Sequence, residues 1–218
     1  MLKHFVIHHF VNFLLRLHNK VYVLLGMFTK DLEPDGLHPK HRIVKYNQFF
    51  IDQVTSLDVV LDIGCGKGSL ARALAPHVKH IVAIEMEANV IQQARSRTKE
   101  GLIEFVHGDA CSYDFGRTFD VIVMSNVLEH IEKREEFLRK VSRLAPRFLI
   151  RVPLLDRDWV TPYKKERGIE YRLSKTHFTE YTKKQFHQEI QSAGLCVESL
   201  TIQFGEIWAV VVPVGVRL

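Results

Sequence analysis

The sequence predicts an α/β fold, in which a doubly wound and mostly parallel sheet ends in an antiparallel hairpin. Short apolar runs alternate with helical segments from residue 58 to residue 152, as is typical of a parallel sheet with helices on both faces. The last two predicted strands, near 195–203 and 206–213, are too close together for a crossover helix, so they must form a hairpin. A separate helical extension, residues 1–39, precedes this domain, residues 40–218.

Length and composition fit one such domain with an appendage. The chain has 218 residues, of which 46% are hydrophobic, and this is enough for one α/β core but not for two large domains. A net charge of +5 is a mild basic excess that suits a phosphate-bearing partner or an anionic surface. The three cysteines lie far apart, which predicts neither a disulfide framework nor a zinc site and favours the cytoplasm.

Residues 1–30 predict an amphipathic helix. Polar side chains interrupt its apolar run and no small-residue cleavage site follows, which argues against an export signal. The polar positions recur every three to four residues and so share one stripe of the helix. They are His4, His8, Asn12, Arg16 and Asn19. We expect the helix to dock on the domain or on a second copy of the chain as a homodimer, or to lie at a lipid interface. No window reaches the roughly 18 apolar residues of a membrane-spanning helix.

From residue 40 onward each segment has the pattern of one element. Two prolines and a glycine in residues 31–39 mark a break, and the apolar spacing in 41–54 then fits a helix that leads into the first strand. The predicted parallel strands cover 58–63, 80–85, 102–107, 119–124 and 147–152. The predicted helices between them cover 68–76, 88–99 and 132–144.

The chain after the fifth strand is less regular. Residues 153–181 form a polar insertion with two prolines and no clear strand. A helix near 182–193 follows and ends at Gly194, after which the closing hairpin begins. A dinucleotide-binding doubly wound fold does not ordinarily end in such a hairpin, so this feature argues against that class.

The turn after the first strand is suited to a ligand. It reads Asp62-Ile63-Gly64-Cys65-Gly66-Lys67-Gly68 and runs directly into a helix. Glycines remove the β-carbons that would collide with a bound molecule, and the start of the helix offers free N–H donors to an anionic group. A nicotinamide or flavin fingerprint needs G-x-G-x-x-G, whereas the third glycine here comes one residue early. The turn therefore disfavours the pyrophosphate geometry of a dinucleotide.

The second strand ends in an acid that predicts a ribose. Glu85 lies about 20 residues past the loop, where a carboxylate suits hydrogen bonds to both ribose hydroxyls. A dehydrogenase carries an acid there too, so Glu85 indicates adenosine without specifying the cofactor. The adjacent Met86 is expected to lie on the adenine or in the core.

The glycine loop and its flanks, VVLDIGCGKGSLARAL, closely resemble the first motif of class I S-adenosylmethionine (SAM) dependent methyltransferases. The resemblance covers roughly residues 40–213 and is to the small-molecule type, with methyltransferase type 11 or 12 domains. It implies that the methionine part of SAM packs on the loop, at Asp62, Gly64, Cys65 and Gly66. It also implies a Rossmann-like seven-stranded sheet in the order 3-2-1-4-5-7-6, whose antiparallel seventh strand accounts for the hairpin.

Two further strand ends match the same family. The third strand ends at Asp109 and Ala110, which the resemblance assigns to the adenine amino group and the adenine ring. The fourth strand runs into Ser125-Asn126-Val127-Leu128-Glu129-His130-Ile131, which resembles the Leu-Glu-His-Ile form of the fourth motif in small-molecule methyltransferases. By that resemblance Ser125, Asn126 and Val127 face the methionine end of SAM. Four successive strand ends with matching residues are a stronger signal than the loop alone.

The acceptor side of the site is less clear from the sequence. Methyl transfer is an in-line displacement that needs alignment, and an oxygen acceptor also needs a general base. Residues 153–181 gather aromatic and ionisable side chains where the family places acceptor loops. The candidate bases are His177 and His130, and the alternative for each is a core or capping histidine. The spacing of carboxylates and histidines assembles no metal site, so we expect a metal-independent enzyme.

These observations predict an enzyme that moves a methyl group from SAM to a small-molecule, glycan or lipid-linked acceptor, with oxygen preferred, and leaves S-adenosylhomocysteine (SAH). The basic N-terminus and the basic run at residues 164–167 suit a phosphate-bearing or membrane-associated acceptor. A nucleic-acid or protein methyltransferase is the first alternative, although no Asn-Pro-Pro-Tyr type motif follows the fourth strand. A non-catalytic SAM-binding subunit is the second. We expect the protein in the cytoplasm, either free or at the membrane periphery.

Overall fold

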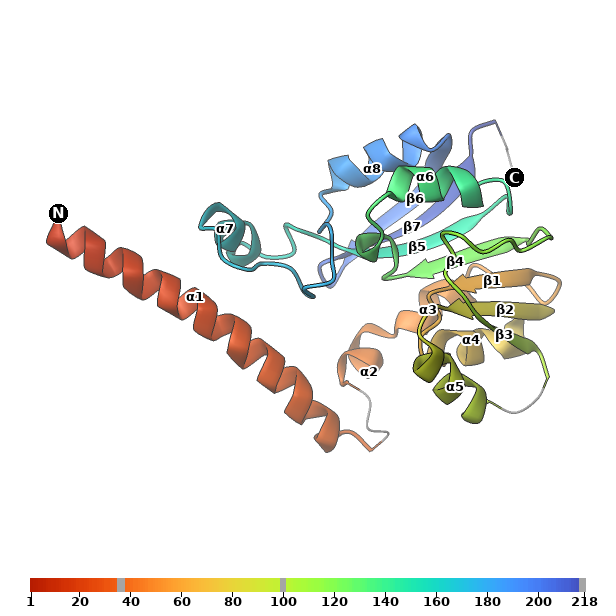
Figure 1. Cartoon of the computed structure of the whole chain (residues 1–218), viewed down its shortest axis with the longest axis horizontal. Coiled ribbons are helices and arrows are strands. Elements are labelled where there is room, and N and C mark those ends of the chain that lie inside the picture. The colour runs from red at the N-terminus through yellow and green to blue at the C-terminus, as the bar shows by residue number, and fades with distance from the viewer. Residues whose placement is uncertain (35–37, 99–100, 216–218) are drawn as a thin grey trace.

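A computed structural model describes residues 1–34, 38–98 and 101–215, and its centre is a seven-stranded sheet (Figure 1). The strand order is β3-β2-β1-β4-β5-β7-β6. The strands are β1 Val59–Ile63, β2 His80–Glu85, β3 Ile103–His107, β4 Val121–Ser125, β5 Phe148–Pro153, β6 Leu195–Gln203 and β7 Glu206–Pro213. Among the strands that the structure describes, β7 runs against the direction of the others and pairs antiparallel with β5 on one side and β6 on the other. The predicted Rossmann-like order and its antiparallel seventh strand are confirmed.

Helices cover both faces of the sheet (Figure 1). One face packs against α6 and α8, and the other against α3, α4 and α5. The helices are α3 Tyr46–Ile51, α4 Ser69–Leu74, α5 Ala88–Ser96, α6 Arg134–Val141 and α8 Lys183–Ser192. Because side chains alternate along a strand, Leu61 joins the first layer and Val60 the second, and both are fully buried. A strand with apolar side chains at successive positions therefore fits a sheet that has helices packed on both faces.

The parallel register brings the carboxyl ends of the central strands to one edge of the sheet. Ile63, the last residue of β1, pairs with Ile84 of β2 and with Met124 of β4. The chain order reverses between β1 and β4, and ligands of open α/β sheets bind in the crevice at such a point. The fold thus predicts a site at this edge.

A tight turn makes the closing hairpin. Phe204 and Gly205 have φ angles of +51° and +72°, so both central residues are left-handed, as a type I′ turn requires. A β-carbon on Gly205 would lie 2.5 Å from Cβ of Arg157, so glycine is needed there for space as well. This turn lets β7 return between β5 and β6.

Two segments differ from the prediction. The single helix expected over 41–54 is wrong, because Lys45 adopts a left-handed φ of +52° that ends α2 (Lys40–Val44) before α3 begins. The insertion holds a helix that its polar composition did not reveal, α7 (Val160–Glu166). Asp158 lies directly before the N-cap residue Trp159, and its Oδ1 accepts a hydrogen bond from the Thr161 N–H in the first turn at 2.6 Å. The predicted break at 31–39 and the predicted helix end at residue 99 lie partly outside the described residues.

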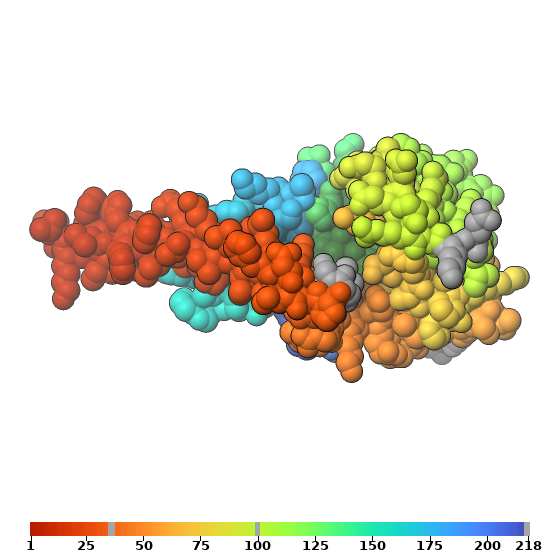
Figure 2. All heavy atoms as spheres, turned by 90° about the horizontal axis from the view of Figure 1, so that it is seen from below, coloured from red at the N-terminus to blue at the C-terminus, as the bar shows by residue number. Residues whose placement is uncertain are grey.

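The N-terminal helix α1 (Leu2–Phe28) projects from the domain as a long arm (Figures 1 and 2). Its polar stripe faces α7 and the residues just after it. Lys164 Nζ donates to Asn19 Oδ1 at 2.6 Å, and the Arg167 guanidinium donates to Asn12 Oδ1 at 2.8 Å. The Asn19 amide in turn donates to the carbonyl of Glu170 at 2.7 Å.

Most apolar side chains of α1 are exposed, and Leu15 is the only one of this helix that is buried. The large exposed ones include Phe5, Phe10, Phe13, Leu14, Leu17, Val21, Leu24, Leu25 and Phe28. The helix therefore docks through its polar stripe and leaves its apolar surface uncovered. In the part of the chain that the structure describes, no helix has the length and apolarity to cross a membrane.

Candidate functional site

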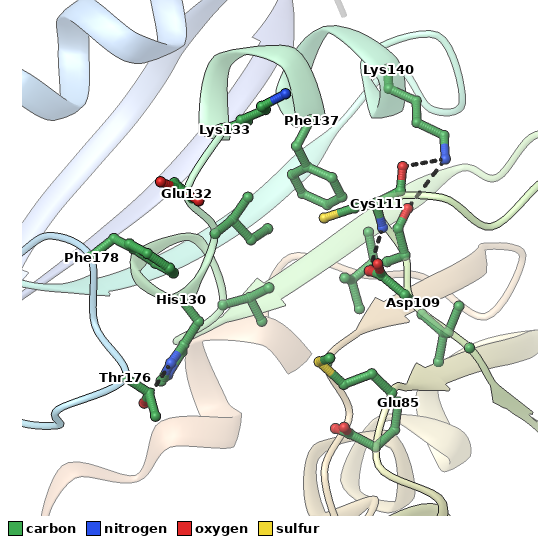
Figure 3. A pocket seen from close by; sticks show the side chains of 18 of the residues that line it. Glu85, Asp109, Cys111, His130, Glu132, Lys133, Phe137, Lys140, Thr176 and Phe178 are labelled. Carbon is green, nitrogen blue, oxygen red and sulfur yellow. Dashed lines mark hydrogen bonds between the residues drawn. The ribbon is translucent and has the colours of Figure 1, made fainter.

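A pocket of about 940 Å³ opens at the carboxyl ends of the central strands (Figure 3). Four strand ends contribute to its wall: β1, β2, β3 and β4. The lining residues predicted from the sequence are Gly64, Glu85, Met86, Asp109, Ala110, Asn126, Val127 and His130. Glu85 and Asp109 lie on one side of the pocket, and His130, Thr176 and Phe178 lie on the other. Asp62, Cys65, Gly66, Ser125 and His177 do not line the pocket.

The glycine loop has a backbone shape that other residues adopt poorly. Gly64 has a left-handed φ of +67°, and a β-carbon there would lie 2.8 Å from Cγ2 of Val127. Gly68 has a φ of +72°, and its β-carbon would lie 3.0 Å from the Phe105 ring. The loop backbone therefore packs closely against Val127 and Phe105, and Gly64 lines the pocket without a side chain that would occupy it.

The loop and Glu85 hold one another in place. Oε2 of Glu85 accepts a hydrogen bond from the Gly66 N–H at 3.0 Å, and Oε1 accepts one from the Glu87 N–H at 3.0 Å. These two backbone donors fix the carboxylate at the rim of the pocket. A carboxylate has about four lone-pair positions, so acceptor capacity remains for a ligand. Met86 beside it is exposed and lines the same pocket.

Behind the loop lies a buried acid. Asp62 is 2% exposed, and its Oδ2 has no hydrogen-bond partner among the described residues. Burial, and then the charge of Glu85, raise the pKa of Asp62 to about 7. Burial and the same two acids also raise the pKa of the Cys65 thiol, which keeps it protonated and unreactive. An incoming cation would offset the cost of ionising Asp62.

The loop after β3 is fixed from two directions. Oδ1 of Asp109 accepts a hydrogen bond from the Cys111 N–H at 2.9 Å, which closes the turn. Lys140 of α6 donates from Nζ to the carbonyl of Cys111 at 2.8 Å (Figure 3). It also donates to the carbonyl of Tyr113 at 2.9 Å. The role of Lys140 was not predicted from the sequence, because a lysine on an amphipathic helix gives no sign of which distant loop it reaches.

The end of β4 carries two polar side chains with different surroundings. The Ser125 hydroxyl accepts a hydrogen bond from Nη1 of Arg151 at 3.2 Å, on the neighbouring strand β5. Asn126 has a left-handed φ of +58°, and its buried Oδ1 has no partner within the described ranges. Asn126 thus presents an unused acceptor from a strained backbone position at the pocket wall.

Two histidines meet on the acceptor side. The rings of His130 and His177 are perpendicular, with centroids 4.5 Å apart. Nδ1 of His130 is 3.0 Å from the Thr176 hydroxyl, and Nδ1 of His177 is 2.9 Å from Oε1 of Glu180. Burial, and then the neighbouring His177, lower the pKa of His130, so it is neutral near pH 7. His130 lines the pocket, whereas His177 is buried behind it.

The insertion at 153–181 contributes little else to the pocket. Only Thr176 and Phe178 of this segment line it. Tyr181 is in the core at 1% exposure, and Glu180 forms a buried ion pair with Arg157 at 2.7 Å. The dense aromatic and charged side chains of the insertion therefore serve mainly to hold the segment against the domain.

Glu129, the neighbour of His130, is also fully buried. Burial raises its pKa to about 8, with its own backbone N–H and then the charge of Arg151 acting in the opposite direction. The sequence placed this residue in the Leu-Glu-His-Ile motif without giving it a role.

Comparison with known proteins agrees with this geometry. Residues 61–146 match a family model described as "Methyltransferase domain". The chain carries a class I SAM-dependent methyltransferase domain. This matched range includes the glycine loop, Glu85, Asp109 and the end of β4. The family resemblance predicted from the sequence is confirmed.

Individual relatives match over part of their length. An uncharacterized methyltransferase from Mycobacterium bovis is 33% identical over 86 residues, which are 39% of this chain and 44% of that protein. The mitochondrial ubiquinone biosynthesis O-methyltransferase from Schizosaccharomyces pombe is 32% identical over 84 residues, 36% of this chain and 31% of that protein. The chain thus matches less than half the length of these two curated relatives.

A solved structure extends the likeness to the whole fold. Magnesium protoporphyrin IX methyltransferase from Synechocystis with bound SAH has a TM-score of 0.61 and 15% identity. The match covers 80% of this chain and 83% of that one. At 15% identity this likeness shows that the two chains share a fold. It does not identify the methyl acceptor of this chain.

Proposed function

We propose that this protein transfers the methyl group of SAM to an oxygen atom of a small-molecule, glycan or lipid-linked acceptor. The observation that supports this best is the single pocket that joins the glycine loop, Glu85 and Asp109 on one side to His130 on the other. One side offers the groups that an adenosine and an amino acid need, and the other offers a neutral histidine.

For the adenosine part of SAM, Glu85 is the proposed partner of the ribose hydroxyls. Its carboxylate is held in place by two backbone N–H groups and keeps lone pairs for two more donors. Asp109 and the Ala110 backbone are proposed to bind the adenine, and the exposed Met86 is proposed to cover its ring.

For the methionine part, the proposed elements are the glycine loop and the end of β4. SAM carries an ammonium and a carboxylate there, and the buried Asp62 beside the loop has an unpaired oxygen that a cation would stabilise. Gly64, Gly66 and Cys65 form the loop. At the end of β4, Asn126 and Val127 line the pocket, and Ser125 lies directly before them in the chain. The unused Oδ1 of Asn126 is a further acceptor for the ammonium.

SAM supplies an electrophilic methyl group on a positively charged sulfur, and the protein's task is to align the acceptor and take its proton. We assign the proton transfer to His130, which lines the pocket and is neutral near pH 7. Thr176 orients its ring through Nδ1, which leaves Nε2 to accept the proton. His177 is assigned a positioning role, because it touches the His130 ring from a buried place outside the pocket.

The α1 arm supports a lipid-linked acceptor. Its surface combines exposed apolar side chains with cations, and residues 1–30 contain no aspartate or glutamate. An anionic bilayer surface attracts such a segment and lets its apolar side chains enter the head-group region. We therefore propose that α1 lies at an anionic membrane surface, and that a homodimer through α1 is the alternative outcome.

Two experiments test these proposals. Incubation with methyl-labelled SAM and a panel of acceptors should label hydroxyl-bearing small molecules or lipids, and labelling of RNA or protein alone would transfer the assignment to those substrates. Flotation with phosphatidylserine vesicles should carry the intact chain and leave a chain without residues 1–30 behind. Equal flotation of the intact and the truncated chain would show that α1 does not carry membrane binding. If the truncated chain no longer self-associates, α1 is instead part of a dimer interface.

A further inference from the structure

Three potential metal ligands meet behind the acceptor side of the pocket. A carboxylate oxygen of Glu129 and one ring nitrogen each of His130 and His177 all lie within 4.8 Å of one another. This group could not be predicted from the sequence, because His177 reaches the other two residues only through the fold of the insertion. Two histidines and one glutamate are the ligand set of a common class of catalytic zinc site.

Each histidine has its other ring nitrogen already engaged. Nδ1 of His177 pairs with the Glu180 carboxylate at 2.9 Å. Nδ1 of His130 pairs with the Thr176 hydroxyl at 3.0 Å (Figure 3). Histidines that bind metals almost always hold such a partner on the second nitrogen, and a carboxylate there strengthens the ligand. Because Nδ1 is engaged in both rings, we assign Nε2 of each histidine as its metal ligand.

The buried carboxylate of Glu129 supports a metal site independently of the two histidines. Its side chain is fully buried, and neither carboxylate oxygen has a hydrogen-bond partner among residues that the structure describes. A buried carboxylate without a partner is costly, so something outside these residues is expected to bind it.

The charges around Glu129 point to a cation. Two other buried carboxylates lie near it, Glu180 and Glu206, and each has an arginine of its own. Arg157 pairs with Glu180 at 2.7 Å, and Arg151 pairs with Glu206 at 2.9 Å. Among the described residues Glu129 forms no ion pair of its own, although the charge of Arg151 reaches it from the Glu206 pair.

We propose that Glu129, His130 and His177 bind a divalent metal ion, for which zinc is the best chemical match. In a tetrahedral zinc site with bonds of about 2.0–2.1 Å the ligand atoms are about 3.4 Å apart. The three donors therefore need to approach by at most about 1.4 Å from their separations of up to 4.8 Å, which side-chain rotation supplies. His130 is exposed to the pocket and provides the route by which the ion enters.

The fourth coordination position would face the pocket, and this part of the inference rests on the proposed function. An acceptor hydroxyl bound to the ion loses its proton to water more readily, because the ion stabilises the oxyanion. The oxygen then forms the new bond to the methyl carbon while the carbon–sulfur bond breaks and its electron pair stays on the sulfur. In this arrangement His130 is a ligand, and the ion takes over the activation of the acceptor.

Zinc binding to the untagged, chelator-treated chain tests the site directly. Equilibrium dialysis should find one zinc ion per chain that is lost, or bound at least about tenfold more weakly, in Glu129→Gln, His130→Gln and His177→Gln. His130 is exposed, so its variant is expected to fold, and circular dichroism checks all three. Cobalt(II) in place of zinc should give the visible absorption of a tetrahedral site in the wild type only.

Matched controls separate this site from other histidines. His4 and His8 are four residues apart on α1 and form a second place where zinc can bind weakly. The double variant His4→Gln, His8→Gln should keep the tight site and its cobalt spectrum. Equal zinc affinity in the wild type and in the three site variants, or no tight zinc in the wild type, would overturn the proposal.

SAM binding measured on the same samples keeps this inference apart from the proposed function. Tight zinc binding without SAM binding would support the metal site and contradict the proposed methyl transfer. SAM binding without zinc would leave the proposed function standing and overturn the metal site.

Discussion

Replacement of Glu85 by alanine is expected to weaken SAM binding by a predictable amount. The carboxylate is fixed by the N–H groups of Gly66 and Glu87, both at 3.0 Å, and the proposed ribose hydroxyls take its remaining lone pairs. Loss of these bonds costs about 1 to 3 kcal/mol of binding free energy. Since about 1.4 kcal/mol is a factor of ten, Kd should rise about five- to 150-fold.

Calorimetry with SAM on both proteins measures this change. Glu87→Ala is the matched control, because it removes the same charge from a residue that lines the same pocket. Thermal unfolding without ligand shows whether the variant loop is still folded. An unchanged Kd in Glu85→Ala, or an equal loss in Glu87→Ala, would refute the assignment of the ribose to Glu85.

Three further predictions concern other residues of the site. The pKa of Asp62 is raised from 3.8 to about 7 in the folded chain. Between pH 3.8 and about 7 the folded state therefore binds a proton that the unfolded state has lost. The free energy of unfolding should fall as the pH rises through this range. Urea unfolding at several pH values should show this slope, and Asp62→Asn should reduce it to the part that Glu129, whose pKa is also raised, contributes. An identical slope in both proteins would contradict the shift. Gly64→Ala places a β-carbon 2.8 Å from Val127 at a φ of +67°, and should lower the free energy of unfolding by about 1 to 3 kcal/mol. Gly116 has a similar φ, but a β-carbon there meets no neighbour. Gly116→Ala should therefore lower the free energy of unfolding by a smaller amount, which reflects the backbone strain alone. His130→Gln should reduce kcat and leave the Kd for SAM unchanged once an acceptor is found, and full activity would end its role at the acceptor.

The strands could be predicted because their signal is local. A strand that is covered on both faces needs apolar side chains in both directions, and Val60 and Leu61 of β1 meet this need on opposite faces. The short connection at Phe204 and Gly205 allowed only a hairpin, which the structure confirms. These inferences needed no knowledge of distant contacts.

Features that depend on distant partners were harder to predict. The spacing of Glu129, His130 and His177 in the sequence is uninformative, because the insertion alone decides that the last ring lies beside the first two. Periodicity likewise placed Asn12 on the polar stripe of α1, but not its contact with Arg167. A pattern shows which side of a helix is polar, and only the packed structure shows what faces it.

The break at Lys45 has a different cause. Apolar residues on both sides of it keep a helical spacing, so the sequence predicted one helix over 41–54. A single left-handed residue turns the chain between α2 and α3, which lets Tyr46 stack on Trp208 with ring centroids 5.9 Å apart. Tertiary packing overrides the local preference at this point.

Binding of SAM, SAH and NAD to the unmodified chain, measured side by side by calorimetry, tests the central claim most directly. The glycine loop, Glu85 and the closing hairpin together predict that SAM and SAH bind in the pocket and that NAD does not. NAD binding in the absence of SAM binding would contradict the assignment of this pocket to a methyl donor.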